Sequence, residues 1–192
     1  MPDEGEEMRD LVMDEGRDKM RKAVGHLQGE FAKVRTGRAS SALVEQLKVE
    51  YYGTETPLQQ LASFGVPEPR VLTISPFDKS SIKSIEKAIQ ESDLGLTPNN
   101  DGNVIRLSIP ELTEERRKEL VKVVHGLAEE GRVAVRNIRR DCMHHLRDLR
   151  KSGDAGEDEE RRAEAELQKL TDANVKDIDE LMKGKEEEIL GG

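Results

Sequence analysis

The sequence predicts an α+β protein in which a small β/α/β domain is inserted into a bundle of three long helices. Apolar residues recur at steps of three and four along three long segments, and short alternating runs lie between the first two of them. Charged residues make up 37% of the chain and aromatic residues only 3%, which suits long amphipathic helices. Helices with a single apolar stripe bury it against one another. The predicted bundle therefore comprises residues 1–35 and 107–192, and the insertion comprises residues 36–106.

The first predicted helix extends from about Met8 to Arg35. Its apolar positions are separated by 4, 3, 4 and 3 residues and lie at Met20, Val24, Leu27, Phe31 and Val34. Three glycines weaken the helix by about 1 kcal/mol each relative to alanine, but the stripe is long enough to keep it. Residues 1–7 precede the pattern and are expected to form a loose extension.

The inserted domain shows strand patterns and one short helix. Residues 47–53, 70–75 and 104–109 read as strands, and residues 97–102 as a turn. A helix beginning near Asp78 has Ile82, Ile85 and Ile89 on one face. An insertion has two connections to its host, here near residues 34–37 and 106–110. Two short neighbouring connections permit rotation about an axis and limit other motions.

The second and third long helices have clear boundaries. Thr113 is a good N-cap, Glu114 and Glu115 follow it in the first turn, and the helix ends at Lys151 before Ser152-Gly153. The third helix begins after Asp154 and continues to the end of the chain. The segment 113–151 has 11 basic and 7 acidic residues, whereas the segment 152–192 has 6 basic and 14 acidic residues. Net positive charge is therefore concentrated in the second long helix of a chain with formal charge −9.

The composition excludes several classes of protein. Cys142 is the single cysteine, so an intrachain disulfide is impossible. The acidic N-terminus lacks the apolar core of a signal peptide, and no run approaches the roughly 20 apolar residues of a membrane span. We therefore expect a cytoplasmic protein.

Six arginines and no lysine lie between positions 132 and 150 of this acidic chain. At 100° per residue they form a strip spanning about 100° of one flank, roughly a right angle from the apolar stripe. The residues are Arg132, Arg136, Arg139, Arg140, Arg147 and Arg150.

The strip has two interpretations. It could be a solvated face whose arginines pair with the acidic third helix. Alternatively it binds phosphates, since arginine presents a planar fork that lysine lacks and a linear strip suits a nucleic-acid backbone. The scarcity of aromatic residues argues against sequence-specific reading of single strands. We favour binding to folded RNA through its phosphates.

No arrangement of residues indicates a metal site or catalysis. Cys142 lies on the apolar stripe, while His144 and His145 point about 100° apart. The chain lacks a glycine-rich phosphate loop, a nucleophile elbow and an HExxH motif. We expect no metal, no cofactor and no catalytic residue.

Several longer motifs carry a resemblance to a known family. From about Met8 to its end the sequence resembles the bacterial ribosome recycling factors, in TGRAS (36–40), VEYYGTETPLQQLAS (49–63), DLGLTPN (93–99), IR (105–106), LTEERRKEL (112–120), VAVRNIRRD (133–141) and LTD (170–172).

The resemblance implies a fold, a function and partners. Members of that family are L-shaped, with a three-helix bundle and a β/α/β domain joined by a hinge. They bind the post-termination ribosome, with the bundle on the 23S rRNA of the large subunit. With elongation factor G, which binds and hydrolyses GTP, they split the subunits and release mRNA and tRNA. The resemblance therefore implies a monomeric non-enzyme without a cofactor or a membrane partner.

The resemblance also implies roles for individual residues. The family's rRNA contacts fall on Arg132, Arg136, Arg139 and Arg140, while Arg147 and Arg150 extend the strip by geometry alone. The hinge falls on Arg35, Thr36, Gly37 and Arg38, opposite Ile105, Arg106 and Leu107. Two alternatives stay open: a non-ribosomal nucleic-acid adaptor using the same strip, and a coiled-coil scaffold whose arginines pair with an acidic protein.

Overall fold

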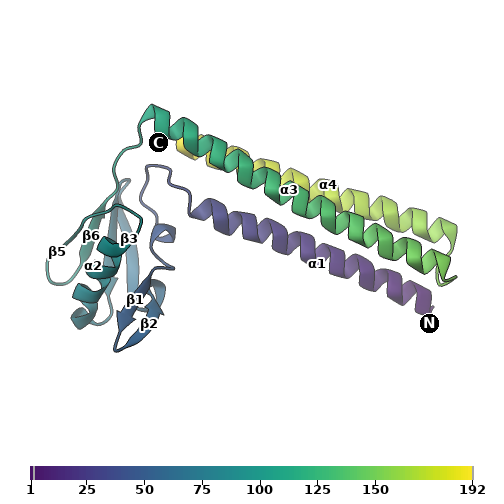
Figure 1. Cartoon of the computed structure of the whole chain (residues 1–192), viewed down its shortest axis with the longest axis horizontal. Coiled ribbons are helices and arrows are strands. Elements are labelled where there is room, and N and C mark those ends of the chain that lie inside the picture. The colour runs from purple at the N-terminus through teal and green to yellow at the C-terminus, as the bar shows by residue number, and fades with distance from the viewer. Residues whose placement is uncertain (2, 192) are drawn as a thin grey trace. The chain divides into compact units, whose positions relative to one another are not determined.

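The computed structural model describes residues 1 and 3–191, which form two compact units (Figure 1). One unit contains residues 1–31 and 121–187, and the other contains residues 32–120 with the end of the chain from Glu188. Among the described residues, no helix combines the length and the apolar character needed to cross a membrane. The combination of long helices and antiparallel sheets confirms the predicted α+β class.

Most of the first unit comes from three long helices: α1 (Glu4–Ala32), α3 (Glu114–Lys151) and α4 (Glu157–Gly191). The start of α3 and the end of α4 are grouped with the second unit. The predicted start of α3 is confirmed, because the Thr113 hydroxyl accepts a hydrogen bond from the Arg116 amide at 3.1 Å. The predicted end is confirmed as well, with Gly153 in the left-handed region at φ +82°. By contrast, α1 begins at Glu4, so residues 4–7 are helical instead of a loose extension.

The apolar stripes of these helices meet in a common core, and two glycines permit their close approach. A Cβ added at Gly131 of α3 would lie 3.2 Å from Leu27 of α1 and 3.4 Å from Ile178 of α4. A Cβ at Gly16 of α1 would lie 2.7 Å from the sulfur of Cys142. Gly16 therefore lowers helix propensity in the sequence but is needed where α1 packs against α3.

The second unit contains two antiparallel sheets and one short helix. In one sheet, β1 (Lys48–Tyr51) pairs with β2 (Thr54–Pro57). The other sheet has the order β3-β4-β6-β5, formed by β3 (Ala62–Glu68), β4 (Val71–Pro76), β6 (Ile105–Ser108) and β5 (Pro98–Asn100). Helix α2 (Ile82–Glu91) buries Ile82, Ile85 and Ile89 in the core of this unit, as its spacing predicts.

Three strands were not predicted, and each has a physical reason. β2 is a mostly polar Thr-Glu-Thr-Pro segment with no buried residue. β3 is an edge strand that contains Gly65 and Pro67, residues that strand interiors disfavour. β5 lies inside residues 97–102, which the sequence predicts as a turn, and its three residues are too few for an alternating pattern.

Candidate nucleic-acid interface

The six arginines of the predicted strip all lie on α3 within the helical unit. Helical geometry divides them into two columns separated by about 60°. We call Arg132, Arg139 and Arg150 the inner column, because they lie nearer the apolar stripe. We call Arg136, Arg140 and Arg147 the outer column.

Arg132, the first residue of the inner column, forms ion pairs with two carboxylates. The side chain of Arg132 is only 16% exposed, and its Nε and one terminal nitrogen lie 2.8 and 2.7 Å from Asp179 of α4. Its other terminal nitrogen lies 3.0 Å from Glu129. Burial lowers the pKa of Arg132, but the hydrogen bonds to Asp179 and Glu129 outweigh that effect and raise it above its ordinary value. Arg132 therefore joins α3 to α4.

The other two inner arginines also turn toward α4. Arg150 donates to the carboxylate of Glu160 at 2.9 Å, and the Glu160 side chain is only 7% exposed. The hydrogen bond to Glu160 raises the pKa of Arg150. Arg139 donates to the amide oxygen of Gln168 at 2.8 Å, a neutral partner that leaves its charge uncompensated. Its Nε is buried and has no hydrogen-bond partner among the described residues.

The outer column has a different environment. Arg140 and Arg147 are exposed, and the structure gives them no ion pair with any residue it describes. Arg136 is 49% exposed, and its closest carboxylate oxygen, on Glu129, is 3.8 Å away. That separation is too long for a hydrogen bond. From Arg136 to Arg147 the column extends about 16 Å along the helix axis, so its cations can contact phosphates in succession.

The residues considered for a metal site do not form one cluster. Cys142 is buried, its sulfur lies 3.9 Å from the carbonyl oxygen of Val12 on α1, and burial raises the pKa of its thiol. His144 and His145 are exposed on α3. Among the described residues, no group of three or more His, Cys, Asp or Glu side chains could hold a metal ion.

The predicted hinge residues fall in two different environments. Arg35, Thr36, Gly37 and Arg38 follow the end of α1 and precede the Ala39 amide, which is bonded to the Pro69 carbonyl at 2.7 Å. Gly37 has φ +79°, which favours glycine. The second set, Ile105, Arg106 and Leu107, belongs to β6, which pairs with both β4 and β5.

A strand paired on both sides and buried at alternate residues is a poor joint. Ile105 and Leu107 are fully buried. The Ile109 amide still bonds to the Arg70 carbonyl at 2.8 Å, so the chain leaves the sheet only after residue 109. The extended connection is therefore residues 110–113, ahead of α3.

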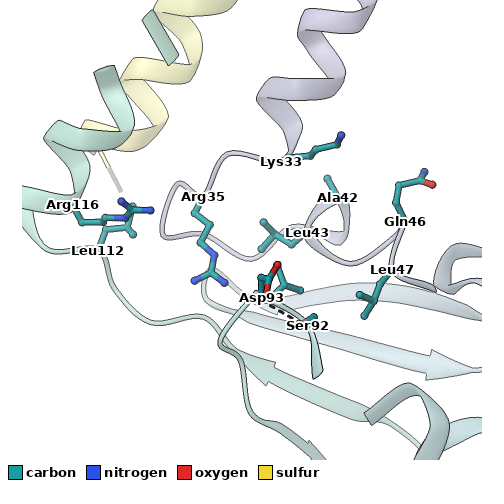
Figure 2. Close-up of a pocket in the computed structure, with 11 residues that line it drawn as sticks. Lys33, Arg35, Ala42, Leu43, Gln46, Leu47, Ser92, Asp93, Leu112 and Arg116 are labelled. Atoms are coloured by element: carbon teal, nitrogen blue, oxygen red, sulfur yellow. Dashed lines mark hydrogen bonds between the residues drawn. The ribbon is translucent and has the colours of Figure 1, made fainter. Parts of the chain in front are cut away.

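A cavity of about 590 Å³ adjoins the first connection (Figure 2). Apolar side chains contribute to its wall, and Lys33, Arg35 and Arg116 bring positive charge to it. Figure 2 shows the Arg35 side chain directed toward the loop that carries Ser92 and Asp93. Nothing in the sequence pattern indicates this cavity, because its lining comes from four separate segments of the chain.

Comparison with known proteins identifies the family. Residues 27–190 match the family described as ribosome recycling factor. The chain belongs to the ribosome recycling factor family. It is 54% identical to the ribosome-recycling factor of Rubrobacter xylanophilus, covering 95% of this chain and 99% of that protein. It is 56% identical to the ribosome-recycling factor of Carboxydothermus hydrogenoformans, covering 93% of this chain and 97% of that protein.

Solved structures of family members agree with this assignment. The chain resembles a solution structure of ribosome recycling factor with a TM-score of 0.78 and 45% identity, over 96% of this chain and 98% of that one. It also resembles a structure described as models for the T. thermophilus ribosome recycling factor and the E. coli elongation factor G bound to the E. coli post-termination complex. The TM-score is 0.69 and the sequence identity is 49%, over 95% of this chain and 99% of that one.

Sequence reasoning missed the division of the arginine strip in this ribosome recycling factor homologue. A signal was present in the positions of the partners. As the inner arginines advance from 132 through 139 to 150, their partners on α4 retreat from 179 through 168 to 160. This is the register of two antiparallel helices, and matching charges along that register would have indicated which arginines are paired.

Proposed function

We propose that this protein is a ribosome recycling factor in function as well as in family. It binds the post-termination ribosome and, with elongation factor G and GTP, splits it into subunits so that mRNA and tRNA are released. The observation that carries the proposal is the match to this family over residues 27–190. The related structure with elongation factor G on a post-termination complex supports it.

We propose that the outer column anchors the protein to 23S rRNA of the large subunit. Arg136, Arg140 and Arg147 lie along one exposed line, and guanidinium groups bind phosphate oxygens in pairs. Arg139 contributes through its uncompensated charge. Arg132 and Arg150 do not bind the RNA in this proposal. Their ion pairs hold α3 against α4 and so keep the outer column in position.

The energy for splitting comes, in this proposal, from GTP bound by elongation factor G. The chain then acts by binding and moving, as a non-enzyme without its own cofactor. Because translation takes place there, the proposal places the protein in the cytoplasm, as a monomer on each ribosome.

The proposed joint consists of residues 33–38 and 110–113, which replaces the second hinge segment expected from the sequence. Gly37 is its most informative position, because proline would force φ from +79° to about −65°. We expect Gly37→Pro to impair subunit splitting more than large-subunit binding. Equal loss of both activities would contradict a joint at this position.

The decisive experiment is a subunit-splitting assay followed by light scattering. Post-termination ribosomes are mixed with elongation factor G and GTP, with and without this protein. We expect splitting only when both factors and GTP are present. Intact ribosomes in the complete mixture would refute the proposed function.

The alternatives give different outcomes in binding experiments. A general nucleic-acid adaptor would bind free RNA as tightly as 50S subunits. A scaffold for an acidic protein would have to use the outer column, because Arg132 and Arg150 of the inner column already pair with carboxylates of α4. If three or four phosphates are contacted, log K should fall with log salt at a slope of about −2 to −4. A flat salt response would favour the scaffold.

A further inference from the structure

A histidine lies beside the outer column, between two of its arginines. His144 follows Arg140 by four residues and precedes Arg147 by three, and all three side chains are exposed on α3. Residues three and four apart are neighbours on a helix surface, with Cβ atoms about 5–6 Å apart. His144 therefore occupies the step between two arginines that are themselves about 10 Å apart along the helix axis.

The ring of His144 is not engaged in another polar contact. The structure gives it no hydrogen bond and no ion pair with any residue that it describes. By helical geometry the side chain points about 160° away from the apolar stripe of α3, and so toward solvent. A polar ring placed in this way among unpaired guanidinium groups is available to the anion that those groups bind.

Charges of both signs surround His144 on its own helix. Arg140 and Arg147 lie on the side of the outer column. Asp141 and Asp148, three residues before the histidine and four after it, lie on its other side. The charges of these four neighbours cancel, so α3 itself supplies no net charge around the ring. A phosphate brought up to the outer column would therefore change the local balance of charge.

The two helices that pack against α3 direct their charges at other faces of it. Charged side chains of α1 act on Cys142, which lies about 160° around α3 from His144. Carboxylates of α4 act on Arg150, which lies about 120° around α3 from His144. These charged residues are Glu15 and Lys19 on α1 and Glu157, Glu160 and Glu164 on α4. The solvent side of His144 is therefore left to an external partner.

We propose that His144 is a further contact between the outer column and rRNA, and that this contact forms only when the ring is protonated. Histidine is the side chain whose charge changes between about pH 5 and 8. After taking up one proton from solvent, the ring donates from both nitrogens and binds phosphate between Arg140 and Arg147. The inference rests on the proposed function, because it takes rRNA to be the anion that the outer column binds. It adds that affinity for the large subunit increases as the pH falls.

Binding to 50S subunits at pH 6 and at pH 8 tests the proposal. We expect the wild type to bind at least about fivefold more tightly at pH 6, because a charged hydrogen bond to phosphate is added there. We also expect log K to fall more steeply with log salt at pH 6, by about 0.9, since one more phosphate is neutralised. The side chain in His144→Gln cannot take up a proton, so this variant should behave at both pH values as the wild type does at pH 8.

The neighbouring histidine provides the matched control. His145 is exposed as well, but it points about 100° away from His144 and further from the outer column. His145→Gln should therefore keep the full pH effect. His144→Arg carries a permanent charge, so it should bind at pH 8 about as tightly as the wild type binds at pH 6. Circular dichroism should show the same helix content in all three variants, which separates loss of the contact from loss of the fold.

The outcomes distinguish this inference from the proposed function. An unchanged pH effect in His144→Gln would place the titrating group elsewhere and overturn the inference. An equal loss of the effect in His145→Gln would overturn it too, because position on the helix would then not matter. Wild-type binding that is the same at pH 6 and pH 8 would refute the inference alone and leave the proposed function intact. Absence of 50S binding at both pH values would refute the proposed RNA anchor and this inference with it.

Discussion

The inner and outer columns of α3 contain the same residue type on the same helix, yet they have different environments. Arg132 is pinned between Asp179 and Glu129, whereas Arg140, two turns further along, is exposed without an ion pair among the described residues. A rotation of about 60° around the helix separates the two situations. The comparison teaches that an arginine strip read from sequence can contain both a structural half and a binding half.

Reversing charge in the outer column should have the largest effect. Arg140→Glu with Arg147→Glu removes two charged hydrogen bonds of about 1.5–3 kcal/mol each, so 50S affinity should fall at least about 100-fold. Helix content by circular dichroism should not change. The matched control, Arg17→Glu with Arg21→Glu, changes charge equally on exposed positions of α1. Equal losses for the two pairs would show that net charge alone matters.

Arg139 is the intermediate case, because its partner Gln168 is neutral and its charge stays available. Arg139→Ala should weaken 50S binding by about 1.5–3 kcal/mol, the range for a charged hydrogen bond, with little loss of helix. Filter binding at several salt concentrations measures this. Unchanged affinity would place Arg139 wholly with the structural arginines.

Arg132 should show the opposite behaviour to the outer column. Arg132→Met keeps the packed stem but removes the ion pairs to Asp179 and Glu129. We expect the free energy of unfolding in urea to fall by about 1–2 kcal/mol and 50S affinity to change less than about threefold. Arg136→Met is the matched variant and should reverse the pattern, with affinity falling and stability constant. If both variants lose only affinity, the two-column distinction is wrong.

The sequence predicts the helices well because each carries a long stripe and explicit ends, such as Thr113 and Gly153 on α3. It predicts the position of the arginines but not their partners. Pairing depends on the register between α3 and α4, which is a tertiary property. The hinge shows a related limit: residues 104–109 read as a strand by their own pattern, and the structure pairs β6 on both sides. The strand pattern of residues 104–109 is itself an argument against a joint at residues 105–107, because a strand paired in a sheet is held in place.

The smallest effect should come from the residue that both columns share. Glu129 lies 3.0 Å from Arg132 and 3.8 Å from Arg136, so it draws an outer arginine toward the inner set. Glu129→Gln should release Arg136 and strengthen 50S binding by about 0.5 kcal/mol, since exposed ion pairs contribute about 0.2–1 kcal/mol. Glu130→Gln removes the same charge from the neighbouring exposed position and should change affinity less. A gain of equal size in both variants would attribute the effect to reduced repulsion of phosphates by the whole helix, and a loss in Glu129→Gln would mean that Arg136 needs its carboxylate neighbour to reach the RNA.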